Sequence, residues 1–268
     1  MGGADLPGAD LPGAAPAVGP VPVLLVHGIR TSATMWRHQL EWLAAANHPV
    51  LAIDLPGHGA RLGEQFTAAA ALAAIDAGVD AVGGTALLVG LSLGGYWTIA
   101  YAARHPEKVL GLVAAGSSFV PSGPGLAVYR LLARQIRRLP DRGLALHTFL
   151  VRRMLREPGV SDVLAGGVAL DVMDAGLGAT GALAPLADLR SYPGRVWLVN
   201  GAWDHFRLHQ NRFRAAASRG TVITVPGAGH LVSLHRPHAF DRILRSIIAE
   251  VEADLRRDHP DSVHGQPG

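Results

Sequence analysis

Two kinds of hydrophobic pattern alternate between residues 21 and 255. Short, continuous apolar runs are typical of buried strands, and we expect strands over 21–26, 49–53, 85–90, 109–114, 195–199 and 221–225. Apolar residues at helical spacing lie between them, which predicts helices over 36–46, 66–77, 96–105 and 237–255. Such an alternation indicates an α/β fold: a mostly parallel sheet of about six strands with helices on both faces.

The alternation stops between residues 120 and 189. This segment begins in the Pro- and Gly-rich run Pro121–Gly125 and shows helical patterns alone, over about 126–139, 144–155, 162–174 and 182–189. A helical insertion between two core strands predicts a cap over the cleft, where lids exclude water. The core then comprises 21–119 and 190–255. Residues 1–20 are rich in Gly, Ala and Pro, and Pro and Gly residues interrupt any helix over 256–268. We expect a disordered leader and a disordered tail.

Composition excludes several classes of function. The 268 residues are 49% hydrophobic and 17% charged, enough for one substantial core, although two small domains are an alternative. The net charge is +3, and Lys108 is the one lysine, so the basic residues are arginines without a nucleic-acid-binding motif. The absence of cysteine excludes disulfides, thiolate metal sites and a Cys nucleophile. No motif indicates a metal or cofactor, and we expect none.

The sequence shows no pattern of a secretory signal or a membrane span, and this sets the expected location. The first twenty residues lack both a basic start and an apolar core, so they do not have the pattern of a secretory signal. No apolar run has the length needed to span a bilayer. We therefore expect a cytoplasmic protein without a membrane span.

Candidate chemistry begins at Ser92. The sequence Gly90-Leu-Ser92-Leu-Gly94 follows a predicted buried strand and precedes a predicted helix. A turn this tight projects the serine hydroxyl into a cleft, and glycines flank it because a Cβ there would collide with the neighbouring chain. In this context the motif predicts a nucleophile at Ser92.

A serine hydroxyl needs a general base and an acid that orients the base. His230 follows the last predicted strand, in the small-residue loop Pro226–His230, and is the candidate base. Asp204 lies between Ser92 and His230 in chain order and follows a predicted strand, so it is the candidate acid. An Asx-turn or helix-cap role is the alternative for Asp204. Weaker candidates for base and acid are His235, His238, Asp174 and Asp188.

A tetrahedral intermediate also needs donors for its oxyanion. The backbone N–H of Leu93, at the start of the helix after the elbow, is one candidate, and the N–H of Ile29, after the first strand, is the second. Gly28 permits a close approach of the substrate in that loop, and Arg30 adjoins it, so both are candidate substrate contacts. His27 is expected to form structural hydrogen bonds.

Four motifs in order resemble the α/β-hydrolase fold superfamily, in its capped serine-hydrolase branch. They are His27-Gly28, the run Asp54–Gly59, the Ser92 elbow, and Asp204 with His230. By this resemblance Ser92, Asp204 and His230 are nucleophile, acid and base. The Asp54–Gly59 motif is usually a structural turn. Family members commonly begin with an antiparallel hairpin, which residues 1–20 cannot supply, so the sheet is expected to be shorter and one edge strand to need cover.

Serine at the elbow argues against haloalkane dehalogenases and epoxide hydrolases, which use Asp there. A lysine-assisted hydroxynitrile lyase is disfavoured because Lys108 lies after the elbow helix. Hydrolysis of a small-molecule carboxylic ester, thioester or lactone through an acyl-enzyme is the expected activity. A cofactor-free perhydrolase, a C–C bond hydrolase and a non-catalytic ligand-binding protein remain alternatives.

Arginines are frequent in the expected cap. One interpretation is attraction of an acidic substrate or of a carrier protein's phosphopantetheine. The simpler one is a solvated amphipathic face, which we favour. The residues are Arg130, Arg134, Arg137, Arg138, Arg152, Arg153 and Arg156.

Overall fold

A computed structural model describes residues 19–258, and the remaining parts of the expected leader and tail lie outside this range. Six strands form one sheet in the order β2-β1-β3-β4-β5-β6, and each neighbouring pair is parallel. The strands are β1 (Val23–Val26), β2 (Val50–Ile53), β3 (Ala86–Leu91), β4 (Val109–Ala115), β5 (Arg195–Gly201) and β6 (Arg219–Val225). The predicted fold class is confirmed.

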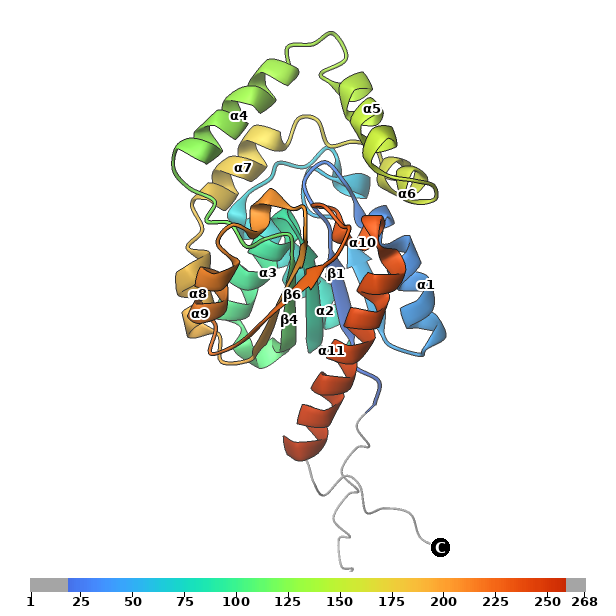
Figure 1. Cartoon of the computed structure of the whole chain (residues 1–268), viewed down its shortest axis with the longest axis vertical. Coiled ribbons are helices and arrows are strands. Elements are labelled where there is room, and N and C mark those ends of the chain that lie inside the picture. Colours follow the sequence, from blue (N-terminus) through green and yellow to red (C-terminus); the bar gives the residue numbers. More distant parts are fainter. Residues whose placement is uncertain (1–18, 259–268) are drawn as a thin grey trace, which may run out of the picture.

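Side chains on alternate positions of each strand enter two separate cores. Leu24 and Val26 of β1 pack in one core, beneath α2 (Ala68–Ala81), α3 (Leu93–Arg104), α8 (Pro185–Ser191) and α9 (Gln210–Ala216). Val23 and Leu25 pack in the other, beneath α1 (Arg37–Ala45) and α11 (Pro237–Asp258). Figure 1 shows these two helix layers on opposite sides of the sheet. Both strand faces are buried, which is why the strands are continuously apolar.

Between β4 and β5 the chain forms five helices and no strand. Figure 1 shows α4 (Pro124–Ile136) and α5 (Leu144–Met154) inclined to each other above the sheet. The helix predicted over 162–174 is wrong, because two helices form there: α6 (Gly159–Ala165) and α7 (Met173–Gly181). Gly166 ends α6, and Gly167 has a φ of +77°, a left-handed conformation that stops a helix at little cost to glycine.

Further helices also differ from expectation, and α2 ends at Ala81, four residues beyond its predicted end. The sequence pattern does not predict α9, because this short polar helix buries few side chains, Phe213 chief among them. The last helix, α11, continues through Asp258, three residues beyond its predicted end. Among the described helices, none is both long and apolar enough to cross a membrane.

The strand order creates a crevice between β1 and β3. From β1 the chain connects to β2 on one side, and the later strands extend from β3 on the other. Val26 pairs with Gly90, so the carboxyl ends of β1 and β3 lie side by side. Ligands of open parallel sheets bind at such switch points. The Ile29 loop and the Ser92 elbow both begin there.

Candidate active site

Ser92 occupies a strained turn between β3 and α3. Its φ is +54° and its ψ is −115°, a conformation that side chains rarely adopt. A Cβ on Gly90 would lie about 2.5 Å from the Gly94 carbonyl oxygen, and one on Gly94 would collide with the Val26 carbonyl oxygen. The two glycines therefore let α3 start directly against β1 and β3. The strand, tight turn and helix around Ser92 thus have the geometry that the sequence motif predicts.

His230 connects Ser92 with Asp204. His230 Nε2 lies 2.9 Å from Ser92 Oγ, and its Nδ1 lies 3.1 and 3.2 Å from the two Asp204 carboxylate oxygens. Because Nδ1–H donates to the carboxylate, Nε2 is left as the acceptor for the serine hydroxyl. Three residues from the ends of β3, β5 and β6 thus form one hydrogen-bonded chain.

Asp204 is fixed from two sides. One carboxylate oxygen also accepts the Phe206 N–H at 2.9 Å, so this side chain is both a turn cap and the partner of His230. Its loop is attached to the His230 loop, since the Trp203 N–H donates to the Ala228 carbonyl at 3.0 Å. Burial favours the neutral acid, but the hydrogen bonds from His230 and Phe206 prevail and hold the pKa of Asp204 below its usual value. The carboxylate is therefore ionised at neutral pH.

The Ile29 and Leu93 amides are both free to donate. Within residues 19–258, neither N–H has a recorded hydrogen-bond acceptor. Leu93 is the first residue of α3, where the helix leaves its N–H groups unpaired. Ile29 follows Gly28, at which a Cβ would contact the Leu91 side chain at 3.1 Å and Ser92 Cβ at 3.5 Å. Gly28 thus lets the Ile29 loop lie directly against the elbow.

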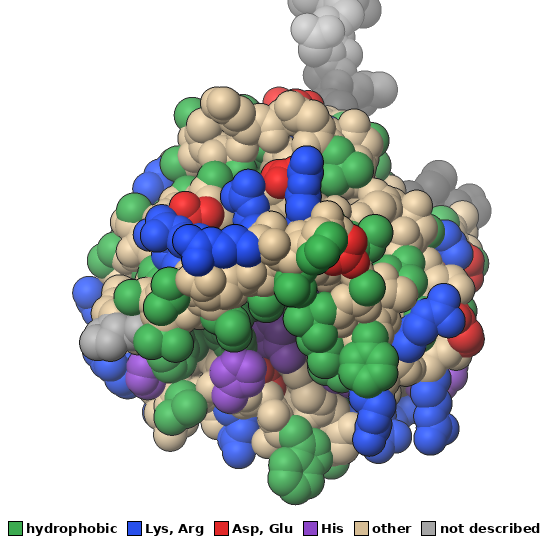
Figure 2. All heavy atoms as spheres, turned by 90° about the horizontal axis from the view of Figure 1, so that it is seen from above, with side chains coloured by type: hydrophobic (Ala, Val, Ile, Leu, Met, Phe, Trp, Pro, Cys, Tyr) green, Lys and Arg blue, Asp and Glu red, His purple; other side chains and the backbone are tan. Residues whose placement is uncertain are grey.

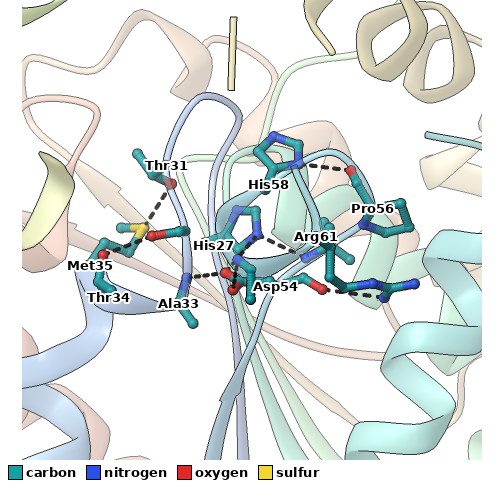
Figure 3. Close-up of polar contacts among 12 residues, drawn as sticks. His27, Thr31, Ala33, Thr34, Met35, Asp54, Pro56, His58 and Arg61 are labelled. Atoms are coloured by element: carbon teal, nitrogen blue, oxygen red, sulfur yellow. Dashed lines mark hydrogen bonds and ion pairs between the residues drawn. The ribbon is translucent and has the colours of Figure 1, made fainter. Parts of the chain in front are cut away.

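A hydrogen-bond network fixes the Ile29 loop to the turn after β2 (Figure 3). The Leu55 N–H donates to His27 Nε2 at 3.0 Å, so the proton of His27 is on Nδ1, which donates to the Gly28 carbonyl at 2.8 Å. Burial lowers the pKa of His27 to about 4 and keeps it neutral. One carboxylate oxygen of Asp54 accepts the Ala33 N–H at 2.7 Å. The other oxygen is available to the turn after β2. These contacts position the backbone that carries the Ile29 amide.

The Asp54–Gly59 motif forms a compact turn. The second Asp54 oxygen accepts the Ala60 N–H at 2.8 Å, and Gly59 has a φ of +53° with no room for a Cβ beside that carboxylate. His58 donates to the Pro56 carbonyl and is fully buried beside His27. Burial, with the nearby His27, lowers the pKa of His58 to about 3. The motif supports the loop and contributes no side chain to the Ser92 chain.

Two neighbours of the site were not found by sequence reasoning. Ser117, after β4, donates to the Ser92 carbonyl at 3.0 Å and lies against Gly95. The Phe206 ring packs on His230, with 4.6 Å between ring centroids. Ser117 and Phe206 contact the candidate catalytic residues from elements distant in sequence, and no local pattern marks them.

Of the weaker candidates, His235 lies against Gly229, at which a Cβ would approach its ring to 3.2 Å, and it forms no recorded hydrogen bond with Ser92 or Asp204 in the described part of the chain. Asp188 is near Arg104, at 4.0 Å, and burial raises its pKa. Asp174 belongs to the cap. His238 lies with His38 and Asp241 in a group whose ligand atoms all fall within 4.8 Å of one another. Asp241 accepts hydrogen bonds from His38, Gln39 and Trp42, and we interpret the group as a connection between α1 and α11 rather than as a metal site.

Most of the basic side chains on α4 have acidic partners within the cap. Arg130 and Arg134 both pair with Asp174, at 2.9 and 3.1 Å. Arg137 and Arg142 pair with Asp171, at 3.5 and 2.7 Å. These pairs connect α4 and the turn after it to the start of α7. These pairs favour the interpretation of the arginines as a solvated amphipathic face.

Exposed apolar side chains gather on α4, α5 and the turn between them, and near Asp204. Ten large hydrophobic side chains between Val128 and Met154 are exposed, and Trp203 and Leu208 are exposed near Asp204. Figure 2 shows the face that carries α4 and α5, with hydrophobic side chains around a hollow in which histidine is visible and basic side chains on several sides of it. An exposed apolar patch of this kind marks a surface for an apolar ligand or partner.

Comparison with known proteins gives the family. The sequence profile of the alpha/beta hydrolase family matches residues 23–243. The chain belongs to this family. Among solved structures, an esterase from Thermogutta terrifontis is similar, with a TM-score of 0.67 and 22% identity over 87% of this chain and 90% of that one. The enol-lactonase from Burkholderia xenovorans LB400 has a TM-score of 0.69 and 18% identity over 86% and 91%. At these identities, the likeness shows the alpha/beta hydrolase fold.

A closer sequence match covers a smaller part. The pimeloyl-[acyl-carrier protein] methyl ester esterase of Neisseria meningitidis serogroup B is 42% identical over 96 residues. The match spans 35% of this chain and 36% of that protein. The chain therefore matches about a third of the length of its curated relatives, among which are esterases of this name.

Proposed function

We propose that this alpha/beta hydrolase is a serine esterase that cleaves a small-molecule carboxylic ester through an acyl-enzyme. The observation that carries the proposal is the chain of hydrogen bonds from Ser92 Oγ through His230 to Asp204. The strained Ser92 backbone adds to it, because such strain is concentrated at functional sites. The names of the similar proteins, two esterases and a lactonase, agree with ester chemistry.

In the proposed reaction, His230 Nε2 takes the proton of Ser92 as Oγ forms a bond to the ester carbonyl carbon. The carbonyl oxygen becomes an oxyanion and accepts hydrogen bonds from the Ile29 and Leu93 amides, each worth about 10²–10³-fold in rate. The carbon–oxygen bond to the alcohol breaks, and the alcohol leaves with the proton from His230. Asp204 stabilises the imidazolium in both steps.

Water completes the cycle. It loses a proton to His230 as its oxygen attacks the acyl carbon, and the acid leaves when Ser92 recovers that proton. No metal or cofactor takes part in these steps. Thioesters and lactones react through the same groups, and so do perhydrolysis and cleavage of activated C–C bonds, so the substrate must be found by assay.

The test uses p-nitrophenyl acetate and a fluorophosphonate label located by mass spectrometry. We expect turnover and a label on Ser92, and loss of both in Ser92→Ala. Ser122→Ala, at an exposed position on the core side of the cap, is the matched control and should keep both. Full turnover by folded Ser92→Ala protein would refute the nucleophile. Absence of any turnover by the wild-type protein on an ester, thioester and lactone panel would favour a non-catalytic binding protein.

A further inference from the structure

Arg30 lies in the loop that carries the Ile29 amide, and it has no polar partner among residues 19–258. Its guanidinium makes no hydrogen bond or ion pair with any residue in 19–258, and its Nε is buried without an acceptor. Its φ of +64° is a left-handed conformation that favours glycine. A strained backbone thus holds an unpaired cation one residue beyond a candidate oxyanion donor.

Nearby arginines differ from Arg30 in having acidic partners. Arg130 and Arg134 share Asp174 in the cap, and Arg37 pairs with Asp162 at 2.9 Å. A buried charge without a counter-charge is unfavourable unless something pairs with it. Burial lowers the pKa of Arg30, and no carboxylate among the described residues offsets this. The Arg30 guanidinium is therefore available to pair with an anion from outside the protein.

A second group without a hydrogen-bond partner among the described residues is His147, which lies close enough to Arg30 to feel its charge. His147 lies on α5, and its Nε2 is buried without a hydrogen-bond partner. Burial and the charge of Arg30 lower the pKa of His147 to about 4, so the ring is neutral near pH 7. A neutral imidazole can donate one N–H without repelling the guanidinium. Tyr129 of α4 also lies close enough to Arg30 to influence its charge.

We propose that Arg30 and His147 together bind a carboxylate of the substrate, which is an ester carrying that carboxylate a few bonds from the scissile carbonyl. This inference rests on the proposed esterase function. The guanidinium fork matches the two oxygens of a carboxylate. One cation with one neutral donor suits a singly charged group better than a phosphate. Since Arg30 follows Ile29 directly, its reach limits the carboxylate to the neighbourhood of the ester.

The experiment compares two nearly isosteric esters, monomethyl glutarate and its neutral carbamoyl analogue, methyl 4-carbamoylbutanoate. We expect wild-type kcat/KM to be at least about tenfold higher for the carboxylate ester, the usual worth of one charge-assisted hydrogen bond. In Arg30→Gln this ratio should fall about tenfold, and in Arg30→Lys by less. Arg212→Gln removes an exposed arginine on α9 and should keep the wild-type ratio.

Equal kcat/KM for the two esters in the wild-type protein would overturn the inference, and so would an unchanged ratio in Arg30→Gln. If Arg30→Gln does not fold, His147→Ala is the second variant and should lower the same ratio by a smaller factor. High salt should reduce the wild-type ratio, because it screens the guanidinium.

A binding measurement tests the anion site independently of the esterase proposal. Calorimetric titration of Ser92→Ala with monomethyl glutarate should give binding that weakens about tenfold when Arg30→Gln is added. Arg30-dependent binding without any wild-type turnover would support the anion site and refute the esterase. Turnover of both esters without Arg30-dependent discrimination would support the esterase and refute the anion site.

Discussion

The loops at the carboxyl ends of the strands hold their polar side chains by hydrogen bonds, whereas the cap leaves large apolar side chains exposed. Around Ser92, His230 and Asp204 are each fixed by at least one partner from another element. On the cap, Leu132 is 54% exposed and Phe149 is 64% exposed. Preorganisation favours chemistry on one fixed set of atoms. The exposed apolar side chains of residues 120–189 form a surface for an apolar ligand or partner instead.

This difference extends to packing. The side chains of β1 and β3 are fully buried, whereas Ala133 is the buried apolar residue among the described side chains of α4. A segment with few buried contacts opens locally at a lower free energy than the core. We therefore expect changes in the strand-end loops to abolish turnover and changes in the cap to alter which ester is used.

The largest expected effect is at Asp204. Asp204→Asn should lower kcat by about 10⁴-fold, because His230 loses the carboxylate that fixes its tautomer and stabilises the imidazolium. The measurement is kcat for p-nitrophenyl acetate, with circular dichroism to check folding. Asp188→Asn is the control, since Asp188 lies near Arg104 and away from Ser92. A similar loss in both variants would remove the distinction between a catalytic and a structural carboxylate.

Leucine truncation compares the two regions directly. Leu88→Ala, in fully buried β3, should lower the free energy of unfolding by about 2–5 kcal/mol through lost burial and a cavity. Leu132→Ala, on the exposed face of α4, should change it by less than about 0.5 kcal/mol. Urea unfolding measures both. Equal losses would mean that the cap is packed as tightly as the core.

Acid should destabilise the strand-end loops through buried histidines. In the folded protein the pKa values of His27 and His58 are lowered to about 4 and about 3, whereas both are near 6.5 when unfolded. The unfolded chain therefore binds more protons below about pH 6.5. Stability is present above that pH and is lost as pH falls toward 4, by about 1.4 kcal/mol per unit for each histidine.

The variant His58→Leu tests this effect. It should shrink the loss of unfolding free energy between pH 7 and pH 5 by about 1–2 kcal/mol, since one titrating group is removed. Leu62→Ala, at an exposed position without a titrating group, should leave the loss unchanged. His147 of the cap has a pKa lowered to about 4 and contributes in the same direction, so the difference between variants is the quantity to compare. An undiminished loss in His58→Leu would contradict the assignment.

The smallest effect concerns the ion pairs of the cap. Asp174→Asn removes the shared partner of Arg130 and Arg134, but all three side chains are about one third exposed or more. Partly exposed pairs contribute about 0–1 kcal/mol, and salt screens them. Urea unfolding at low and high salt should show a loss within that range that shrinks with salt. A loss of several kcal/mol would show that these pairs hold the cap together.

The sequence by itself determined the core and the chemistry that the core can carry. The inner strands are apolar on both faces because both faces are buried, so the run that contains Leu24 and Leu25 predicted a parallel sheet. The motif around Ser92 and the order of Asp204 and His230 in the chain predicted which side chains meet. Such signals are local, because they reflect the backbone geometry of a single turn or strand.

Only the tertiary structure decided what surrounds those residues. The break of the 162–174 pattern into α6 and α7, and the presence of α9, depend on packing that local periodicity does not record. The contact of Ser117 with the elbow and the meeting of Arg30 with His147 join segments that lie 25 and 117 residues apart. Whether a charge has a partner is a property of space rather than of sequence, and that property distinguishes Arg30 from the paired arginines of the cap.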